Sequence, residues 1–375
     1  MNTLRPPDGK ALPADSRPTG QRRLLALTHT PDDPATRFRI KQYIPYLQRA
    51  GWEVSLKTNR PPRPWQSPVR NPALRYFHRR LGVWRRRINR RRDIRAASAA
   101  EAVFLNRDVL ESNVRYERLL LARNPRLIFD FDDAIFLDGK EAHVGWVCRH
   151  AAWVTAGNPD LADFARRFTD RVTVLPTVID TDTYLPAGGG ARLGPIRVGW
   201  CGSDLSIRQT LFPHLPMLAR LQQRLGFEIV IMTRPRPVLP QKSLRWTFVE
   251  WSEERETRLA SFFDAGLMPL IPDEYQRYKC GCKLLQYMAS GLPSVASPVG
   301  INVRLIAEAR SGFLAETEEE WFRSIELLMS DGRLCREFGA AGRAFVEKDY
   351  SLKTWRPVLL ELLDRIAEKP LRRSS

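Results

Sequence analysis

Residues 277–300 read RYKCGCKLLQYMASGLPSVASPVG. The segment opens with a Cys-Gly-Cys turn flanked by Lys279 and Lys283. It continues with a helical pattern over 283–290 and ends in a short apolar strand at 293–297. A turn, a helix and a buried strand in direct succession are typical of α/β proteins, in which apolar strands alternate with helices.

The same alternation extends through the rest of the chain and predicts an α/β fold with mostly parallel sheets. Strands are predicted at 24–28, 52–56, 102–106, 127–131, 153–157, 172–176, 196–200, 228–232, 246–250 and 266–270. Helices are predicted at 36–51, 161–168, 211–225, 253–263, 318–330 and 333–347.

The alternation is interrupted at 185–195, where four glycines and two prolines in LPAGGGARLGP predict a linker. We therefore expect two Rossmann-like domains, at 22–184 and 196–348, each of which would bind ligands at the carboxyl ends of its strands. Residues 1–21 are expected to form a disordered leader. A long amphipathic helix is predicted within 349–367, followed by a tail at 368–375.

Composition excludes several protein classes. The chain has 375 residues, of which 43% are hydrophobic, so it can build cores and is not disordered throughout. It has neither an apolar run long enough to span a membrane nor a secretory signal pattern, so we expect a cytoplasmic protein. The five cysteines are scattered, odd in number and without a C-x-x-C pair, so we expect neither a disulfide framework nor a structural zinc site.

The net charge of +18 is concentrated in one segment. Residues 70–95, RNPALRYFHRRLGVWRRRINRRRDIR, contain eleven arginines and one acidic residue, Asp93. Such a band attracts polyanions: nucleic acid, anionic lipid headgroups or phosphorylated substrates. Because no nucleic-acid-binding module appears, we favour a membrane surface, with Phe77 and Trp84 dipping into it from an amphipathic helix. A solvated basic helix is the alternative.

Two stretches offer binding groups for an anionic ligand. In the turn CGSD at 201–204, Gly202 permits close backbone approach and a helix start offers N–H groups, although an ordinary tight turn has the same sequence features. Lys279 and Lys283 flank Gly281 at the start of a helix, where lysines are unfavourable with the helix dipole. An anionic ligand explains them better than a solvated pair of lysines.

The pattern K-C-G-x-K-L-x-Q-Y-M-A-x-G-L-P-x-V-A-S-P-V-G at 279–300 resembles nucleotide-sugar glycosyltransferases of family four, which have the GT-B fold. The resemblance covers roughly residues 22–367 and implies two Rossmann-like domains facing across a cleft, with a C-terminal helix that returns to the N-terminal domain. Other stretches are similar to family segments and occur in the right order: 36–47, 129–133, 175–182, 251–254 and 268–270.

The resemblance implies a donor site in the C-terminal half. There, Gly202 and Ser203 would contact the donor diphosphate, Lys279 and Lys283 would offset its charge, and the backbone at Gly281 would assist. Gln286 stands where the family has a ribose-binding glutamate, and Tyr278 stands where it often has a sugar-binding one. Glu250 and Trp251 would lie near the base, and Arg208 is a candidate for a further family cation.

The implied reaction is sugar transfer with retention, from a nucleoside-diphosphate sugar and without metal or cofactor. Our candidates for catalysis are Arg37, Asp132 and Asp133. The two aspartates could orient or deprotonate the acceptor hydroxyl. Alternatively, they only cap the turn at the end of the strand. Arg39 and Arg107 are candidates for binding an acceptor phosphate. His29 and His143 are expected to be hydrogen-bonded structural histidines.

Together these features predict a retaining glycosyltransferase of cell-surface polysaccharide biosynthesis, acting on a glycan or lipid-linked acceptor at the inner face of the membrane. Two alternatives stay open. One is another GT-B enzyme, such as a nucleotide-sugar epimerase, and the other is a degenerate GT-B scaffold that binds polyanions without turnover. The residues Tyr278 and Gln286 favour degeneration, whereas the intact lysine-glycine-lysine arrangement at 279–283 argues against it.

Overall fold

The computed structural model describes residues 22–60, 72–110, 114–186 and 194–368. The predicted leader, most of the predicted linker and most of the tail lie outside these ranges. The chain divides into two compact units: the first ends at Thr177 and takes up the chain again at Trp355, and the second spans Val178–Thr354. Each unit is described by itself below.

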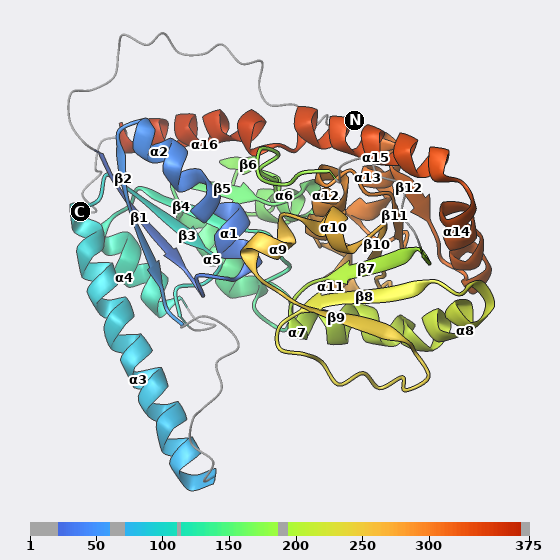
Figure 1. The fold of residues 1–375 in the computed structure, drawn as a ribbon. Helices are drawn as coiled ribbons and strands as arrows, with labels where there is room; N and C mark the ends of the chain where they lie inside the picture. The colour runs from blue at the N-terminus through green and yellow to red at the C-terminus, as the bar shows by residue number, and fades with distance from the viewer. Residues whose placement is uncertain (1–21, 61–71, 111–113, 187–193, 369–375) are drawn as a thin grey trace. The chain divides into compact units, whose positions relative to one another are not determined.

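The first unit is built on one fully parallel sheet with the strand order β2-β1-β3-β4-β5-β6 (Figure 1). The connection from β1 leads to β2 on one side and the connection from β3 leads to β4 on the other, and such a divergence marks a crevice at the carboxyl ends of β1 and β3. The strands are β1 (Arg22–Thr28), β2 (Trp52–Thr58), β3 (Ala102–Asn106), β4 (Leu127–Phe131), β5 (Trp153–Ala156) and β6 (Val172–Val174).

Helices connect these strands. They are α1 (Pro34–Arg39), η2 (Lys41–Tyr43), α2 (Ile44–Arg49), α3 (Pro72–Ala96), η3 (Ala97–Ala99), α4 (Arg115–Arg123), α5 (Glu141–His150) and α6 (Pro159–Arg166). The single helix predicted at 36–51 was wrong. The backbone leaves the helical conformation at Ile40 (φ −143°), and Pro45 lies in the first turn of α2, where its missing N–H costs nothing.

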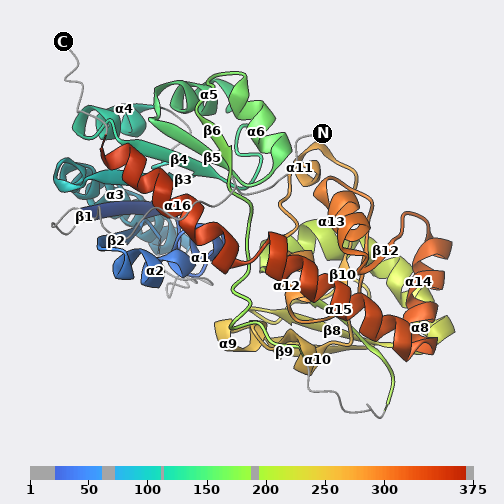
Figure 2. The ribbon, with the colours of Figure 1, turned by 90° about the horizontal axis from the view of Figure 1, so that it is seen from above.

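The C-terminal helix α16 (Leu352–Ala367) returns to the first unit, as predicted. Its Asp364 accepts hydrogen bonds from Arg22 at the start of β1 and from the Trp52 indole of β2, at 2.6 and 3.0 Å. On the same helix, the Arg365 guanidinium lies 4.6 Å from the Trp153 ring centroid. Figure 2 shows α16 lying beside this sheet.

The second unit repeats the architecture with a parallel sheet ordered β12-β11-β10-β7-β8-β9. Its crevice lies at the carboxyl ends of β7 and β10, since connections leave β7 to one side and β10 to the other. The strands are β7 (Arg197–Cys201), β8 (Glu228–Thr233), β9 (Trp246–Glu250), β10 (Ala265–Met268), β11 (Ser294–Ala296) and β12 (Gly312–Leu314).

Two elements of this unit were not predicted from the sequence patterns: the helix α13 (Ile301–Ala309) and the strand β12 that follows it. The helices predicted at 211–225 and 253–263 are each divided into shorter elements. The helical elements are α7 (Asp204–Ser206), η4 (Ile207–Leu211), η5 (Phe212–His214), α8 (Leu215–Leu225), α9 (Glu253–Glu256), α10 (Leu259–Phe262), α11 (Glu274–Arg277), α12 (Cys282–Ala289), α13, α14 (Glu318–Ser330) and α15 (Gly332–Asp349).

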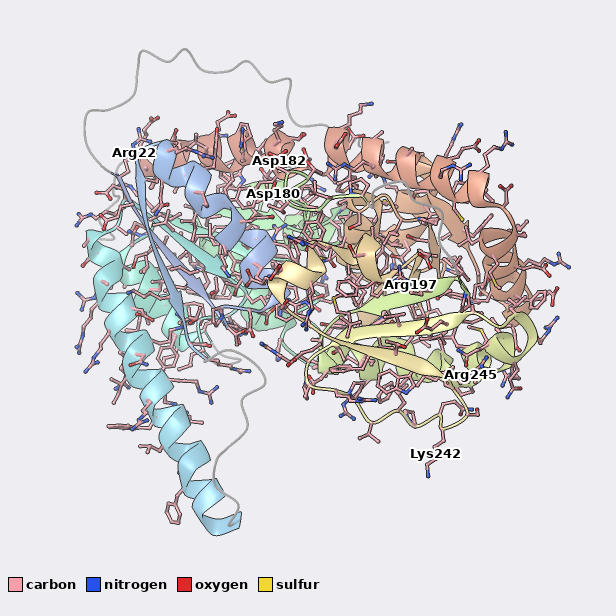
Figure 3. All side chains as sticks on the ribbon, in the orientation of Figure 1. Arg22, Asp180, Asp182, Arg197, Lys242 and Arg245 are labelled. Carbon is pink, nitrogen blue, oxygen red and sulfur yellow. The ribbon has the colours of Figure 1, made fainter. Side chains whose placement is uncertain are left out.

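Residues 178–186 lie in the second unit, although our prediction extended the first domain to residue 184. The Ile179 N–H donates to Tyr350 O, and the Leu352 N–H donates back to Ile179 O, at 2.9 Å each. Arg343 of α15 also holds this segment, because its guanidinium donates to the carbonyls of Thr181 and Tyr184. Figure 3 labels Asp180 and Asp182, which belong to the same segment.

None of the described helices combines the length and the apolar composition that crossing a membrane requires.

Candidate functional site

The second unit brings the two predicted anion-binding stretches to its crevice. Gly202 and Ser203 follow β7, and the connection after β10 leads through α11 to Lys279, Gly281 and α12. Since β7 and β10 are neighbours, both stretches leave the sheet at the same edge and at the point where the connections diverge. Open α/β sheets bind their ligands at this position.

One lysine joins the two stretches directly. The Lys283 ammonium donates a hydrogen bond of 3.0 Å to the Ser206 hydroxyl and lies 5.2 Å from the Trp200 ring centroid. Ser203 caps the helical run that begins at Asp204, because its hydroxyl accepts from the Ser206 N–H at 3.2 Å. The side chains of Ser203, Ser206 and Lys283 therefore form one polar cluster after β7.

Gly202 keeps this space open. A Cβ atom at this position would lie 2.6 Å from the Trp200 ring and 2.9 Å from Cε of Lys283. A side chain at 202 would thus displace the lysine, so the glycine allows a cation to lie against the backbone that follows β7.

Gly281 shapes the start of α12. Its φ of +67° is in the left-handed region, and a Cβ there would lie 2.4 Å from Leu305. The turn sets Lys279 before the helix and Lys283 within its first turn. The Lys279 ammonium lies 4.9 Å from the Tyr275 ring centroid. No acidic residue occupies the first turn of α12, which leaves the positive end of the helix to an anion.

Glu250 and Trp251 lie where β9 ends. The Glu250 carbonyl accepts from Arg255 at 2.8 Å, and the Trp251 N–H donates to the carbonyl of Thr233 at 3.0 Å. The Trp251 indole is bonded to Glu256 at 3.0 Å, and the Arg234 guanidinium lies 5.3 Å from its ring centroid. In the sheet, β9 lies two strands from β7, with β8 between them.

Gln286 lies on α12 one turn after Lys283 and is buried. Its side-chain amide donates to the hydroxyl of Tyr184 at 2.9 Å, and this hydroxyl bonds to Glu256 at 3.0 Å. Sequence reasoning missed Tyr184, Ser206 and Glu256. Nothing in their local sequence marks them, because the contacts join segments that are far apart in the chain.

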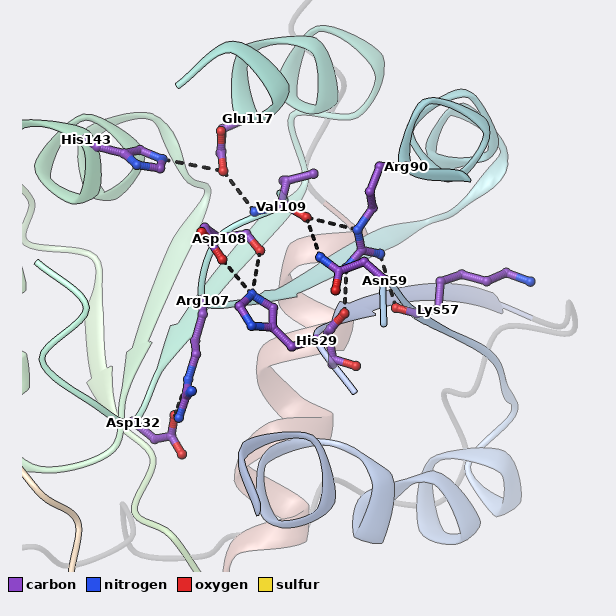
Figure 4. Close-up of polar contacts among 11 residues, drawn as sticks. His29, Lys57, Asn59, Arg90, Arg107, Asp108, Val109, Glu117, Asp132 and His143 are labelled. Carbon is purple, nitrogen blue, oxygen red and sulfur yellow. Dashed lines mark hydrogen bonds and ion pairs between the residues drawn. The ribbon is translucent and has the colours of Figure 1, made fainter. Parts of the chain in front are cut away.

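In the first unit, the crevice between β1 and β3 holds a histidine-aspartate pair (Figure 4). His29 follows β1, Asp108 follows β3, and His29 Nε2 lies 2.5 Å from Asp108 Oδ1. Burial alone would raise the pKa of Asp108, but the hydrogen bond and charge of His29 outweigh it and lower that pKa. The histidine that we expected to be structural is thus hydrogen-bonded, and it lies at the ligand-binding edge of the sheet.

Arg107 connects the same edge to the end of β4. Its guanidinium donates to Asp132 at 3.1 Å and to Asp133 at 2.6 Å, and these three side chains are 14–22% exposed. The φ of Arg107 is +65°, a conformation that is uncommon outside glycine and recurs at functional sites. The predicted acceptor-side residues Arg107, Asp132 and Asp133 therefore form one ionic cluster.

Arg39, a predicted phosphate-binding residue, is buried in the core, whereas a residue that binds an acceptor phosphate must be accessible. Its side chain is 0% exposed and pairs with Asp130, whose carboxylate also accepts from Asn106 and Thr155. Burial alone would lower the pKa of Arg39, but the charge of Asp130 outweighs it and raises that pKa. Arg39 is a core residue and does not form part of a surface site. Arg37 on the same helix is also buried, with its guanidinium 5.0 Å from the Phe38 ring centroid.

Residues 72–95 of the arginine band lie in α3, and one of these arginines is buried. Arg90 is 0% exposed and donates to the carbonyls of Val109, Thr28 and Lys57 (Figure 4). It therefore ties the helix to the sheet and offers no charge to a polyanion. His143 of α5, which we expected to be a hydrogen-bonded structural histidine, is half-buried, and its Nε2 lies 3.4 Å from Glu117 Oε1.

The rest of α3 carries apolar and basic side chains in the same stretch. The exposed fractions are 68% for Phe77 and 59% for Trp84, and Tyr76 and Leu81 are also exposed. Several arginines are exposed as well: Arg80, Arg85, Arg87, Arg91, Arg92 and Arg95. Figure 1 shows the helix extending past the sheet of its unit.

Among the described residues, no group of three or more His, Cys, Asp or Glu side chains is arranged to hold a metal ion.

Comparison with known proteins gives a family-model match within the second unit and a similar fold along most of the chain. Residues 209–331 match the model of the family described as "Glycosyl transferases group 1". No curated protein sequence matches the chain.

Several solved structures are similar in fold along nearly the full chain. Sucrose-phosphate synthase from Thermosynechococcus elongatus has a TM-score of 0.67 at 14% identity, covering 92% of this chain and 99% of its own. Anabaena HepE in complex with UDP and glucose has a TM-score of 0.65 at 12% identity, with coverages of 91% and 99%. WaaG, a glycosyltransferase involved in lipopolysaccharide biosynthesis, has a TM-score of 0.57 at 15% identity, with the same coverages.

Proposed function

We propose that the chain is a group 1 glycosyltransferase and that it transfers a sugar, with retention, from a nucleoside-diphosphate sugar to a glycan or lipid-linked acceptor. The donor would bind at the crevice of the second unit. One observation carries this proposal: the Lys283 ammonium of α12 is hydrogen-bonded to Ser206, in the helical run after β7. The strands β7 and β10 are neighbours, and the glycines at 202 and 281 leave space beside the backbone near this lysine.

These groups suit the charge that develops during sugar transfer. The bond from the anomeric carbon to the diphosphate breaks, and negative charge accumulates on the leaving oxygen. Lys279, Lys283 and the N–H groups at the start of α12 would stabilise that charge from fixed positions, and they need no reorganisation as it forms. Gly202 and Ser203 would contact the diphosphate from the other side. Glu250 and Trp251 would lie near the base.

We assign the acceptor to the first unit. The Arg107 cluster with Asp132 and Asp133, together with the His29–Asp108 pair, supplies both cations and proton acceptors at the carboxyl edge of the sheet. Within this assignment Asp132 and Asp133 orient the acceptor hydroxyl, and Arg37 contributes a positive charge. Arg39 is left out because its buried pairing with Asp130 serves the core.

We further propose that α3 attaches the enzyme to an anionic membrane surface, where a lipid-linked acceptor of cell-surface polysaccharide synthesis would be found. Exposed Phe77 and Trp84 beside exposed arginines support this, since aromatic groups enter the headgroup region while basic groups stay at the charged surface. The lipopolysaccharide pathway named for WaaG is compatible with such an acceptor.

A thermal-shift screen tests the donor proposal. The full chain is heated with UDP-glucose, GDP-mannose or ADP-glucose at low millimolar concentration, without added metal. A ligand that binds only the native state raises the melting temperature by mass action. We expect a shift with one nucleotide sugar and release of its nucleoside diphosphate when an acceptor extract is added. A chain unaffected by all three would instead be a scaffold that retains the fold.

A further inference from the structure

Arg90 of α3 bonds the backbone at the carboxyl edge of three strands of the first unit (Figure 4). Its Nε donates to the carbonyl of Val109 at 3.0 Å, and its two terminal nitrogens donate to the carbonyls of Lys57 at 3.2 Å and Thr28 at 2.5 Å. Thr28 is the last residue of β1, Lys57 is the last but one of β2, and Val109 follows β3. Each of the three guanidinium nitrogens therefore holds a different segment of the chain.

Two of these segments carry the histidine-aspartate pair. His29 directly follows Thr28, and Asp108 directly precedes Val109. His29 Nε2 lies 2.5 Å from Asp108 Oδ1 and 3.4 Å from the Asp108 carbonyl oxygen. Arg90 thus bonds the residues next to both members of the pair, so a shift of either bonded segment would change the distance between the imidazole and the carboxylate.

The partners of His29 Nε2 determine which ring nitrogen carries the proton. A carboxylate and a carbonyl oxygen can only accept, so Nε2 must donate. Burial alone would raise the pKa of Asp108, but the hydrogen bond and charge of His29 lower it, so the carboxylate is ionised at neutral pH. In a neutral imidazole, Nδ1 is then an acceptor. Within the described part of the chain no residue bonds Nδ1, and the His29 side chain is 19% exposed.

Stability alone does not explain a buried arginine at this position. The Arg90 side chain is 0% exposed, and its ion pair with Asp93 has an N–O distance of 3.3 Å. Burial lowers the pKa of Arg90, and the charges of Asp93 and Asp108 offset this only in part. An apolar side chain of similar volume often stabilises a core as well as a buried ion pair does. A planar group with five N–H donors, however, can hold three carbonyls at fixed relative positions.

We propose that Arg90 is a positioning residue of the acceptor site. It fixes the segments that carry His29 and Asp108, so that Nδ1 of His29 accepts a hydrogen bond from a hydroxyl group of the acceptor. The inference rests on the proposed function of the first unit, to which it adds a residue that does not itself touch the substrate.

The fold should survive the replacement of Arg90, because other side chains hold the same segment. The Val109 carbonyl also accepts from the Asn59 amide at 3.3 Å, and the Val109 N–H donates to Glu117 at 2.9 Å. Two variants are compared. Arg90→Lys keeps the charge but replaces the planar fork with a point group, and Arg90→Met removes every donor. Where Arg90→Met fails to fold, Arg90→Lys decides alone.

The first test observes the tautomer of His29 directly. The histidines of the full chain are labelled with ¹⁵N, and their ring nitrogens are observed by NMR at about pH 9, where a free imidazole is neutral. His29→Gln identifies the signals of His29. In the unaltered chain we expect a protonated Nε2 and an unprotonated Nδ1, with widely separated signals. In both Arg90 variants these signals should move toward each other, since a loosened imidazole exchanges between its tautomers.

Asn124→Ala is the matched control. Asn124 is buried in the same unit, and its amide donates to the carbonyls of Ala97 and Ala100 at 2.9 and 2.8 Å. These bonds precede β3 and β4, so they lie at the edge of the sheet opposite to His29. The variant should lower the melting temperature and leave the His29 signals in place. An equal change of the signals in Asn124→Ala, or no change in the Arg90 variants, would overturn the positioning role.

The second test asks whether Nδ1 meets a sugar hydroxyl. The methyl glycosides of glucose, galactose and N-acetylglucosamine are titrated to high millimolar concentration while the Nδ1 signal is followed. We expect one glycoside to move this signal in the unaltered chain. The same glycoside should bind Arg90→Lys about fivefold more weakly, as expected for the loss of one hydrogen bond, and should bind Asn124→Ala with unchanged affinity.

The two tests separate this inference from the function on which it rests. If no glycoside moves the Nδ1 signal, the proposed acceptor site and the contact with an acceptor hydroxyl are both contradicted, while the tautomer comparison still decides whether Arg90 holds the pair. If a glycoside binds, but its affinity and the His29 signals are unchanged in Arg90→Lys, the positioning role is overturned and the acceptor site stands.

Discussion

The Lys283 ammonium and the Ser206 hydroxyl are 3.0 Å apart, so the first turn of α12 is bonded to the helical run that follows β7. This contact places a cation between the ends of two neighbouring parallel strands of the second unit. Both segments had been selected separately from the sequence as candidates for binding an anion. Their direct connection favours one shared ligand over two unrelated sites.

The buried pair of Arg39 and Asp130 should be important for the stability of the first unit. Asp130→Asn keeps the shape of the side chain but leaves the Arg39 charge uncompensated in the core. We expect a loss of about 3 kcal/mol in the free energy of unfolding, measured by urea denaturation. Asp163→Asn, which removes an exposed partner of Arg166, should leave stability unchanged. Equal effects of the two substitutions would show that the buried pair has no special role.

Gly281 should be required for its backbone conformation as well as for space. Gly281→Ala puts a side chain at φ +67° and a Cβ atom 2.4 Å from Leu305. Gly226→Ala has a similar φ of +77° but nothing within 4 Å of the new Cβ. We expect Gly226→Ala to cost about 1 kcal/mol from strain alone, and Gly281→Ala to cost more and to reduce nucleotide affinity. Full nucleotide affinity in Gly281→Ala would argue against a role for this turn in binding.

Vesicle binding should depend on the exposed part of α3. Replacing Arg80, Arg85, Arg91 and Arg92 with Gln should reduce affinity for phosphatidylglycerol vesicles roughly tenfold or more in a sedimentation assay. Arg90 is left unchanged because it bonds three backbone carbonyls of the core.

The control for this experiment changes the same number of charges elsewhere. Four exposed arginines of the second unit are replaced with Gln: Arg258, Arg323, Arg333 and Arg336. If this variant loses vesicle affinity to the same extent, the effect is due to net charge and α3 is not a specific attachment site.

The His29–Asp108 pair predicts a pH dependence of stability. The folded pKa of Asp108 is lowered, so the folded state binds its proton less readily than the unfolded chain does. The stabilisation is complete above the ordinary pKa of aspartate and is lost as the pH falls through the lowered value. Asp108→Asn should therefore cost about 1 kcal/mol at pH 7 and progressively less below about pH 4. Urea denaturation across this range measures the difference, and Asp170→Asn, an exposed aspartate of the same unit, should show none.

Much of the fold could be predicted because buried parallel strands have an unmistakable sequence pattern. The stretches AVFLN and LIFDF form β3 and β4 with the predicted bounds. The helical patterns were less reliable where prolines restart the helix, as at Pro45. The strand β12 was missed because it begins at a glycine and offers only two apolar residues, Phe313 and Leu314, which do not stand out from the surrounding chain.

The site was less predictable than the fold, because its residues meet through tertiary contacts. Lys283 could be selected from its place at a helix start, but Ser206 is 77 residues away in the chain. The role of Arg39 could not be predicted either. An arginine on an early helix resembles a surface residue in the sequence, and only the structure shows its buried ion pair with Asp130. Local patterns report secondary structure and turns, and they do not report which distant side chains share a bond.

The most direct test of the account compares two lysines of the second unit. Lys242, labelled in Figure 3, is exposed in the loop between β8 and β9, whereas Lys283 bonds Ser206 at the crevice. Nucleoside-diphosphate affinity is measured by isothermal titration calorimetry for Lys283→Met and Lys242→Met, with UDP, GDP and ADP. The account predicts at least a roughly tenfold loss for Lys283→Met, as expected for a hydrogen bond to a charged group, and no change for Lys242→Met. Equal affinities in the two variants would contradict a phosphate-binding role for Lys283 and with it the proposed donor site.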